Sequence, residues 1–188
     1  GKKLFSDDFF FLEEILIKFL LDYCVKKSLD FYIIPRIKSN VVNNFLLQFD
    51  KSKNKIHILE KKDRYINYQY LDEFDYLAGT ETTMTYEALA RKQKIAIFCL
   101  RGLILKKQAP GIDLNIDQYN FLWPGNSNIT GKYWTHLNDK ETMTKILDFV
   151  TNCTDQEWYN ELNKINSNDL ILYDLGNTKL KNLINKNI

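Results

Sequence analysis

The stretch that decides the fold runs from Asp75 to Cys99 and reads DYLAGTETTMTYEALARKQKIAIFC. It begins with a short apolar run that ends at Gly79, and it closes with a second apolar run over residues 94–99. Between the two runs, threonines open a segment whose Glu, Ala and Leu residues favour a helix. A strand, a helix and a second strand in this order predict a βαβ unit and therefore a parallel sheet.

The same alternation extends over most of the chain. Apolar periodicity and turn residues predict strands at 31–34, 56–59, 75–79 and 94–99, and helical segments at 6–27, 40–49, 68–74, 80–91, 139–153, 155–165 and 178–187. Residues 101–131 read as irregular, and we expect a long functional loop over 101–135. The pattern predicts an α/β fold with a Rossmann-like, doubly wound parallel sheet carrying helices on both faces. We expect one domain over residues 1–188.

Composition excludes several classes of function. The chain has 188 residues with 26 basic and 24 acidic side chains, so a formal net charge of +2 argues against a nucleic-acid partner. No segment approaches the roughly 18 consecutive apolar residues that a membrane helix needs, so we expect no membrane span. Three widely spaced cysteines fit a reducing compartment. We therefore expect a cytoplasmic protein, or one held peripherally at the inner face of the membrane.

Polar and basic residues follow three of the predicted strands. Arg36 follows the first strand, the turn from Gly79 to Thr83 follows the third, and Arg101 follows the fourth. Ligands bind at the carboxyl ends of the strands in open α/β sheets. We therefore expect these residues to converge on one ligand.

The turn after the third predicted strand is the most informative of these junctions. Gly79, Thr80, Thr82 and Thr83 precede a helix, and small residues with free N–H groups at a helix N-terminus can bind phosphate. The simpler alternative is that Thr82 or Thr83 only caps the helix. Glu87 lies further along the same helix, where its carboxylate can accept hydrogen bonds from ribose hydroxyls, or can be a solvated glutamate.

Other kinds of site find little support in the sequence. His57 and His136 are the only histidines and lack metal-ligand spacing, so we predict no metal. The phosphate-loop pattern and the GxSxG nucleophile pattern are both absent. Trp134, in the predicted loop, can stack on a base or a sugar, or can fill the core.

The residues from 70 to 98 resemble the donor-binding domain of GT-B glycosyltransferases. More narrowly, they are similar to bacterial surface-carbohydrate biosynthesis proteins, including a Kdo-transferase-like branch, which carry a strand, a Ser/Thr-rich turn and a helix with YEAxARG. Here that motif reads YEALARK over residues 86–92. Three further segments look like family segments: FLWPG at 121–125, GKYWT at 131–135 and DLGN at 174–177. The sequence departs from the pattern at Lys92 and Leu122, where the family has glycine, and Lys92 puts the close packing of helix and strand in doubt.

The resemblance implies a nucleotide-sugar site and no separate cofactor. Glu87 would hold the ribose, the turn from Thr80 to Thr83 would hold phosphate, and Arg36 would bind phosphate or a donor carboxylate. Arg101 gains the same carboxylate role if the donor is CMP-Kdo, and a UDP-sugar is the other option. The partner would be an N-terminal acceptor domain, and the acceptor a growing glycan or a lipid-linked glycan.

Two other functions stay open from the sequence. One is a sugar-nucleotide epimerase, which shares the GT-B architecture, although such an enzyme would want a histidine and this chain has few. The other is a non-catalytic interaction domain that keeps the fold without binding a nucleotide.

Overall fold

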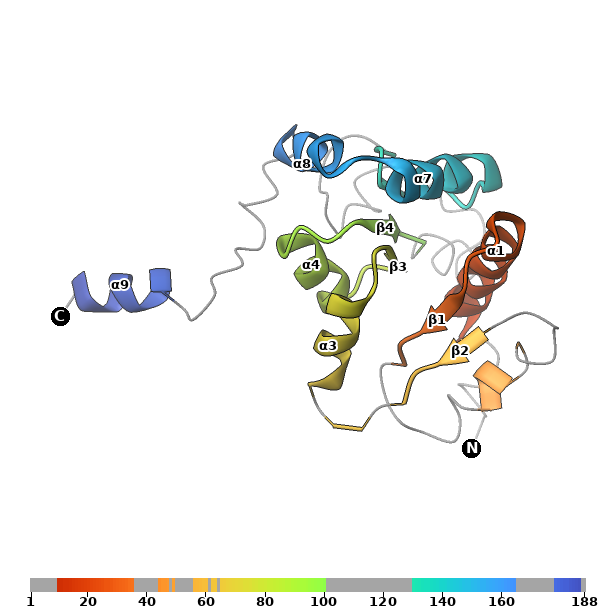
Figure 1. Cartoon of the computed structure of the whole chain (residues 1–188), viewed down its shortest axis with the longest axis horizontal. Coiled ribbons are helices and arrows are strands. Elements are labelled where there is room, and N and C mark those ends of the chain that lie inside the picture. The colour runs from red at the N-terminus through yellow and green to blue at the C-terminus, as the bar shows by residue number, and fades with distance from the viewer. Residues whose placement is uncertain are drawn as a thin grey trace, which may run out of the picture.

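The computed structural model describes residues 10–35, 44–47, 49, 56–60, 62–63, 65–100, 130–164 and 178–186. Within these ranges the chain is a mixed α/β protein, as predicted, and its short strands pair in parallel. In chain order, the elements are α1 (Phe11–Lys27), β1 (Phe31–Ile33), β2 (Ile56–Ile58), α3 (Ile66–Glu73), β3 (Leu77–Gly79), α4 (Thr83–Ala90), β4 (Ile95–Phe98), β5 (Trp134–Thr135), α7 (Lys140–Asn152), α8 (Asp155–Lys164) and α9 (Thr178–Lys186) (Figure 1).

The strands form two small sheets. In one, β1 pairs with β2, and in the other the order is β3-β4-β5. Leu77 of β3 lies opposite Ile95 of β4, and Ile97 of β4 lies opposite Trp134 of β5. The predicted βαβ unit is therefore present as β3-α4-β4, with its two strands parallel and adjacent.

Strand β4 is the centre of the larger sheet. All four of its residues, Ile95 to Phe98, are buried. Because successive side chains of a strand point to opposite faces, complete burial means that both faces of β4 are covered. Helices α4 and α7 lie on opposite sides of β4 (Figure 1).

The main hydrophobic core joins the beginning of the chain to its later helices. It extends from Leu12 of α1 to Leu162 of α8. The Tyr23 hydroxyl in α1 donates to Asp148 of α7 at 2.9 Å and lies 3.1 Å from the Thr151 hydroxyl. Burial is the main cause that raises the pKa of Tyr23 to about 12. Helix α1 is thus tied to α7 by packing and by hydrogen bonds.

Strand β5 corrects the expectation of a long loop over 101–135. Its backbone completes the edge of the larger sheet, since the amide of Ile97 donates to the Tyr133 carbonyl and the amide of Cys99 donates to the Thr135 carbonyl, each at 2.8 Å. A strand of two residues is too short to give an alternating pattern, which explains why sequence periodicity missed it. Residues 101–129 lie outside the described part of the chain.

Helix α1 begins at Phe11, and the first residues of the predicted helical segment, 6–9, lie outside the described residues. The helix ends at Ser28, which adopts a left-handed conformation with φ of 57°. The amide of Ser28 donates to the Val25 carbonyl, and the next amide donates to the Cys24 carbonyl. This pair of bonds is a Schellman motif, which usually places glycine in the left-handed position.

Helix α9 stands apart from the other elements in Figure 1. None of the helices among the described residues is long and apolar enough to cross a bilayer.

Candidate functional site

Three strand ends meet at the carboxyl edge of the larger sheet. Because β3, β4 and β5 are parallel, the residues that follow them lie at the same edge. Thr80 begins the segment after β3, Cys99 follows β4, and His136 follows β5. This edge is where open α/β sheets bind their ligands, so we define it as the carboxyl-edge site.

The turn between β3 and α4 is built by Gly79 and two threonines. The Thr82 hydroxyl accepts a hydrogen bond from the Thr85 amide at 3.2 Å, so Thr82 caps α4, and the two hydroxyls lie 2.8 Å apart. A Cβ atom on Gly79 would lie 2.8 Å from the Thr85 hydroxyl oxygen. Gly79 therefore allows the helix to approach the strand closely, and the capping alternative for Thr82 is confirmed.

The first turn of α4 is where the sequence predicts an anion to bind, and the structure places the N-terminus of the helix there. Amides in the first turn of a helix lack partners within the helix, and the helix dipole favours a negative charge there. Thr83, the first residue of α4, is exposed. Thr80 lies beside it, half-buried, and its carbonyl accepts a hydrogen bond from the Thr82 amide at 2.8 Å.

Three titratable residues lie close together at this turn, and sequence reasoning did not select them as site residues. Burial raises the pKa of the Cys99 thiol, and the negative charge of Glu81 raises it further. Burial also raises the pKa of Tyr86, with smaller contributions from Cys99 and Glu81. These mutual effects place Glu81, Tyr86 and Cys99 close together, so the thiol and the phenol are both neutral at neutral pH.

His136 contributes a buried imidazole after β5. Burial lowers its pKa, and a hydrogen bond to the backbone of Cys99 opposes that shift. Its ring centroid lies 5.6 Å from that of Trp134, in an edge-to-face arrangement. At neutral pH the carboxyl edge therefore presents a neutral imidazole beside a neutral thiol. Had β5 been predicted, His136 would have been selected as a candidate site residue, because His136 is the first residue after that strand.

The other predicted site residues lie in different surroundings. Glu87 of α4 is half-buried and lies about 200° around the helix from Thr85, which faces the core. It is four residues before Arg91, which pairs with Asp72 of α3 at 2.5 Å. Glu87 therefore belongs to the side of α4 that faces away from the sheet.

Trp134 is part of the core, with 1% of its surface exposed. Its indole lies over Gly131, where any Cβ atom would overlap the ring. Of the two roles that the sequence left open for Trp134, the structure thus shows that it fills the core. Arg36 and Arg101 lie outside the described residues. Of the predicted residues, the structure brings together Gly79, Thr80, Thr82 and Thr83.

The comparison with family models covers the whole chain. A family described as "putative O-antigen biosynthesis protein" matches residues 1–188. The chain belongs to this family. No curated protein and no solved structure matches the chain. The family description points to surface-carbohydrate biosynthesis, which is the broad context that the sequence resemblance implied.

The segment at 86–92 of this family member closes α4 against its neighbours. The amide of Lys92 donates to the Leu89 carbonyl at 2.8 Å and the amide of Gln93 to the Ala88 carbonyl at 3.1 Å, so α4 ends in a second Schellman motif. Lys92 has a φ of 65°, and its carbonyl accepts the Trp158 indole N–H at 2.9 Å. The close packing that the absence of glycine put in doubt is therefore achieved, at a backbone cost of about 1 kcal/mol.

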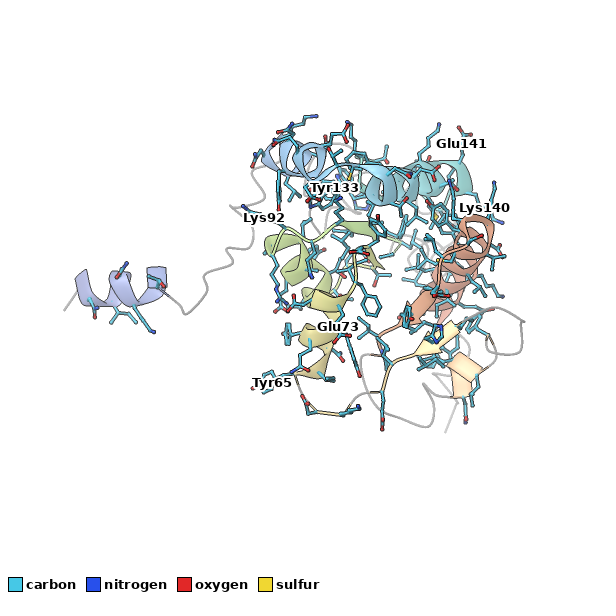
Figure 2. The ribbon with its side chains drawn as sticks, viewed as in Figure 1. Tyr65, Glu73, Lys92, Tyr133, Lys140 and Glu141 are labelled. Carbon is cyan, nitrogen blue, oxygen red and sulfur yellow. The ribbon has the colours of Figure 1, made fainter. Side chains whose placement is uncertain are left out.

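The segment at 131–135 is also mainly structural in this family member. Tyr133 is fully buried, and its ring centroid lies 5.1 Å from that of Trp158 in α8. Lys132 lies 3.6 Å from the buried carboxylate of Glu161, which also pairs with Lys164 at 2.9 Å. Figure 2 labels Tyr133 beneath α7 and α8. These contacts fix the segment that carries β5 and so position His136.

Among the described residues, no group of three or more His, Cys, Asp or Glu side chains is arranged to hold a metal ion. Within the described part of the chain, the carboxyl edge offers helix amides, threonine hydroxyls and the buried groups Tyr86, Cys99 and His136 near Glu81.

Proposed function

We propose that this chain is the nucleotide-sugar-binding domain of a glycosyltransferase in surface-polysaccharide synthesis, with a Rossmann-like GT-B fold. The observation that carries the proposal is the turn from Gly79 to Thr83, which leads into the N-terminus of α4 at the carboxyl edge of a parallel sheet. A diphosphate or monophosphate ester placed there would accept hydrogen bonds from helix amides and from the Thr83 hydroxyl. The membership of the family supports the saccharide context.

The donor in this proposal is CMP-Kdo or a UDP-sugar. Arg36 and Arg101 would bind its phosphate or its sugar carboxylate, since arginine binds such oxyanions bidentately. Glu87 would accept the ribose hydroxyls only if the ribose reaches the outer side of α4. The acceptor, a growing or lipid-linked glycan, would bind a partner domain that faces the carboxyl edge. The protein would act in the cytoplasm or at the inner face of the membrane.

The non-catalytic alternative keeps support from two observations. The Thr82 hydroxyl is already used as a helix cap, and Trp134 is buried in the core. Two of the predicted ligand-binding side chains therefore already have structural roles.

Thr83→Asp tests the proposal with little risk to the fold. An acidic residue in the first turn of a helix is favourable by about 0.3–1 kcal/mol, so the variant should be at least as stable as the parent protein. A fixed negative charge at the phosphate position should nevertheless weaken CMP or UMP binding by about tenfold or more. Isothermal titration calorimetry measures the affinity, and Thr83→Asn is the neutral control of similar size.

The two nucleotides and one further variant complete this experiment. Binding of CMP or of UMP identifies the base of the donor, and Glu87→Ala tests the ribose contact. Equal nucleotide affinity in Thr83→Asp and in the parent protein would place the phosphate elsewhere and contradict the proposed site. Failure of both nucleotides to bind the parent protein would favour the non-catalytic alternative.

A further inference from the structure

A hollow lies at the end of the larger sheet opposite the carboxyl-edge site. Its volume is about 240 Å³, and its lining includes residues just before β3, residues just before β4 and the first turns of α8. The carboxyl-edge site is separated from it by the length of β4, about 13 Å at 3.3 Å per residue. We call it the amino-edge hollow. Its volume is below the roughly 300–1,000 Å³ of pockets for drug-sized molecules, so it suits a single sugar ring.

Two exposed tyrosines flank this hollow. Tyr76 precedes β3 and Tyr159 lies in α8, and each has 42% of its surface exposed. Tyrosine combines an apolar ring face with a polar hydroxyl, which suits a ligand that has both C–H and O–H surfaces. Tyr76 and Tyr159 therefore bring apolar ring surface and hydroxyl groups to the lining of a mostly polar hollow.

The charges around the hollow cancel. Lys94 is held by Asp155, with the amine 2.9 Å from the carboxylate, and the same amine donates to the Cys153 carbonyl at 2.7 Å. Lys92 and Asp75 contribute one charge of each sign. Ammonium groups only donate hydrogen bonds and carboxylates only accept them, so this lining suits an uncharged ligand rich in hydroxyl groups.

The backbone at Lys92 gives an independent indication. A left-handed residue at the end of a helix is usually glycine, because a side chain there costs free energy. Lys92 occupies that position with a φ of 65°, and its amine lies 5.5 Å from the centre of the Tyr159 ring. Figure 2 labels Lys92 at the end of α4, on the side of the molecule where α8 lies. The side chain that takes the place of glycine here thus carries an ammonium group to the rim of the hollow.

We propose that the amino-edge hollow binds one uncharged sugar residue of a saccharide, with Tyr76 and Tyr159 against the ring and Lys92 donating to a hydroxyl. This site is separate from the nucleotide-sugar site and does not depend on it. The membership of an O-antigen biosynthesis family makes a saccharide the relevant hydroxyl-rich ligand. The hollow would hold the glycan at a second point, away from the edge where a donor is proposed to bind.

Nuclear magnetic resonance titration of the full chain tests this proposal. The probes are the methyl glycosides of galactose, mannose, rhamnose and N-acetylglucosamine, with galacturonic acid as the charged comparison. We expect a neutral glycoside to shift the backbone amides at 75–76, 92–94 and 155–159. Tyr159→Ala and Tyr76→Ala should each weaken that binding by about tenfold. CMP and UMP should instead shift residues 80–83, so the two proposed sites fail or succeed separately.

Lys92→Gly and Ser28→Gly form a matched pair. Both remove a side chain from a left-handed position that closes a helix, so both should raise the melting temperature. Only Lys92→Gly should lose glycoside affinity, by about tenfold. The proposal is overturned if no neutral glycoside shifts the amides of the hollow, if galacturonic acid alone does so, or if Lys92→Gly and the two tyrosine variants bind like the parent protein.

Discussion

Trp134→Ala is expected to lower the free energy of unfolding by about 3–5 kcal/mol, the usual cost of truncating a fully buried large aromatic side chain. The indole is 1% exposed and lies between Gly131 and His136. A domain of this size is stable by only about 5–15 kcal/mol, so the variant should be largely unfolded at moderately raised temperature. Chemical denaturation followed by circular dichroism measures the change.

Trp134→Phe separates packing from polar contributions. The indole N–H has no hydrogen-bond partner among the described residues, so its removal should cost little. The smaller ring should cost less than the alanine change does. A ligand-stacking role predicts a different result, in which Trp134→Ala loses nucleotide affinity but keeps its stability. That result would contradict a structural role for Trp134 and would support the predicted binding role.

Alkaline pH is expected to destabilise the protein steeply. Burial raises the pKa of the Cys99 thiol and of the Tyr86 and Tyr133 hydroxyls above their ordinary values of 9.0 and 10.0. The unfolded chain releases these protons first as the pH rises, so the folded chain holds more protons above about pH 9. Below that pH the three buried groups leave the free energy of unfolding at its full value. Above the ordinary pKa of each group, the free energy of unfolding falls by about 1.4 kcal/mol per group for each pH unit.

Denaturation curves between about pH 8 and pH 11 test this expectation, together with tyrosinate absorbance. Buried tyrosines should ionise only when the protein unfolds. Tyr133→Phe is the matched control, because it removes one titrating group and should make the pH dependence shallower by about one proton. A free energy of unfolding that stays constant over this range would contradict the burial of these groups.

The sequence predicted the strands and helix ends that are determined by neighbouring residues in the chain. The apolar run over 94–99 became β4, and the threonine-rich turn became the capped start of α4, because strand burial and helix capping are short-range effects. The position of Thr83 as the first residue of α4 could also be predicted, since a helix that follows a strand and a threonine-rich turn is a sequence feature. Strand β5 could not, because two residues carry no periodicity.

The composition of the carboxyl edge depended on long-range pairing. Cys99 and His136 lie 37 positions apart in the sequence and meet only because β4 and β5 pair in parallel. The orientation of Glu87 likewise depends on which face of α4 packs on the sheet, and Thr85 and Leu89 decide that face. The presence of Glu87 in the sequence motif therefore does not specify which way its side chain points.

The hydrogen bond between Tyr23 and Asp148 joins residues 125 positions apart, which matters while the chain is being synthesised. At about 5–20 residues per second, a ribosome needs roughly 6–25 s after adding Tyr23 before it adds Asp148. During that interval the apolar side of α1 has no partner from α7. The nascent chain must therefore keep the part of α1 that packs on α7 uncovered until the later helix emerges, although Ile17 can pack earlier with Leu46 and Phe49. Chaperones that shield such helices should associate with it during translation.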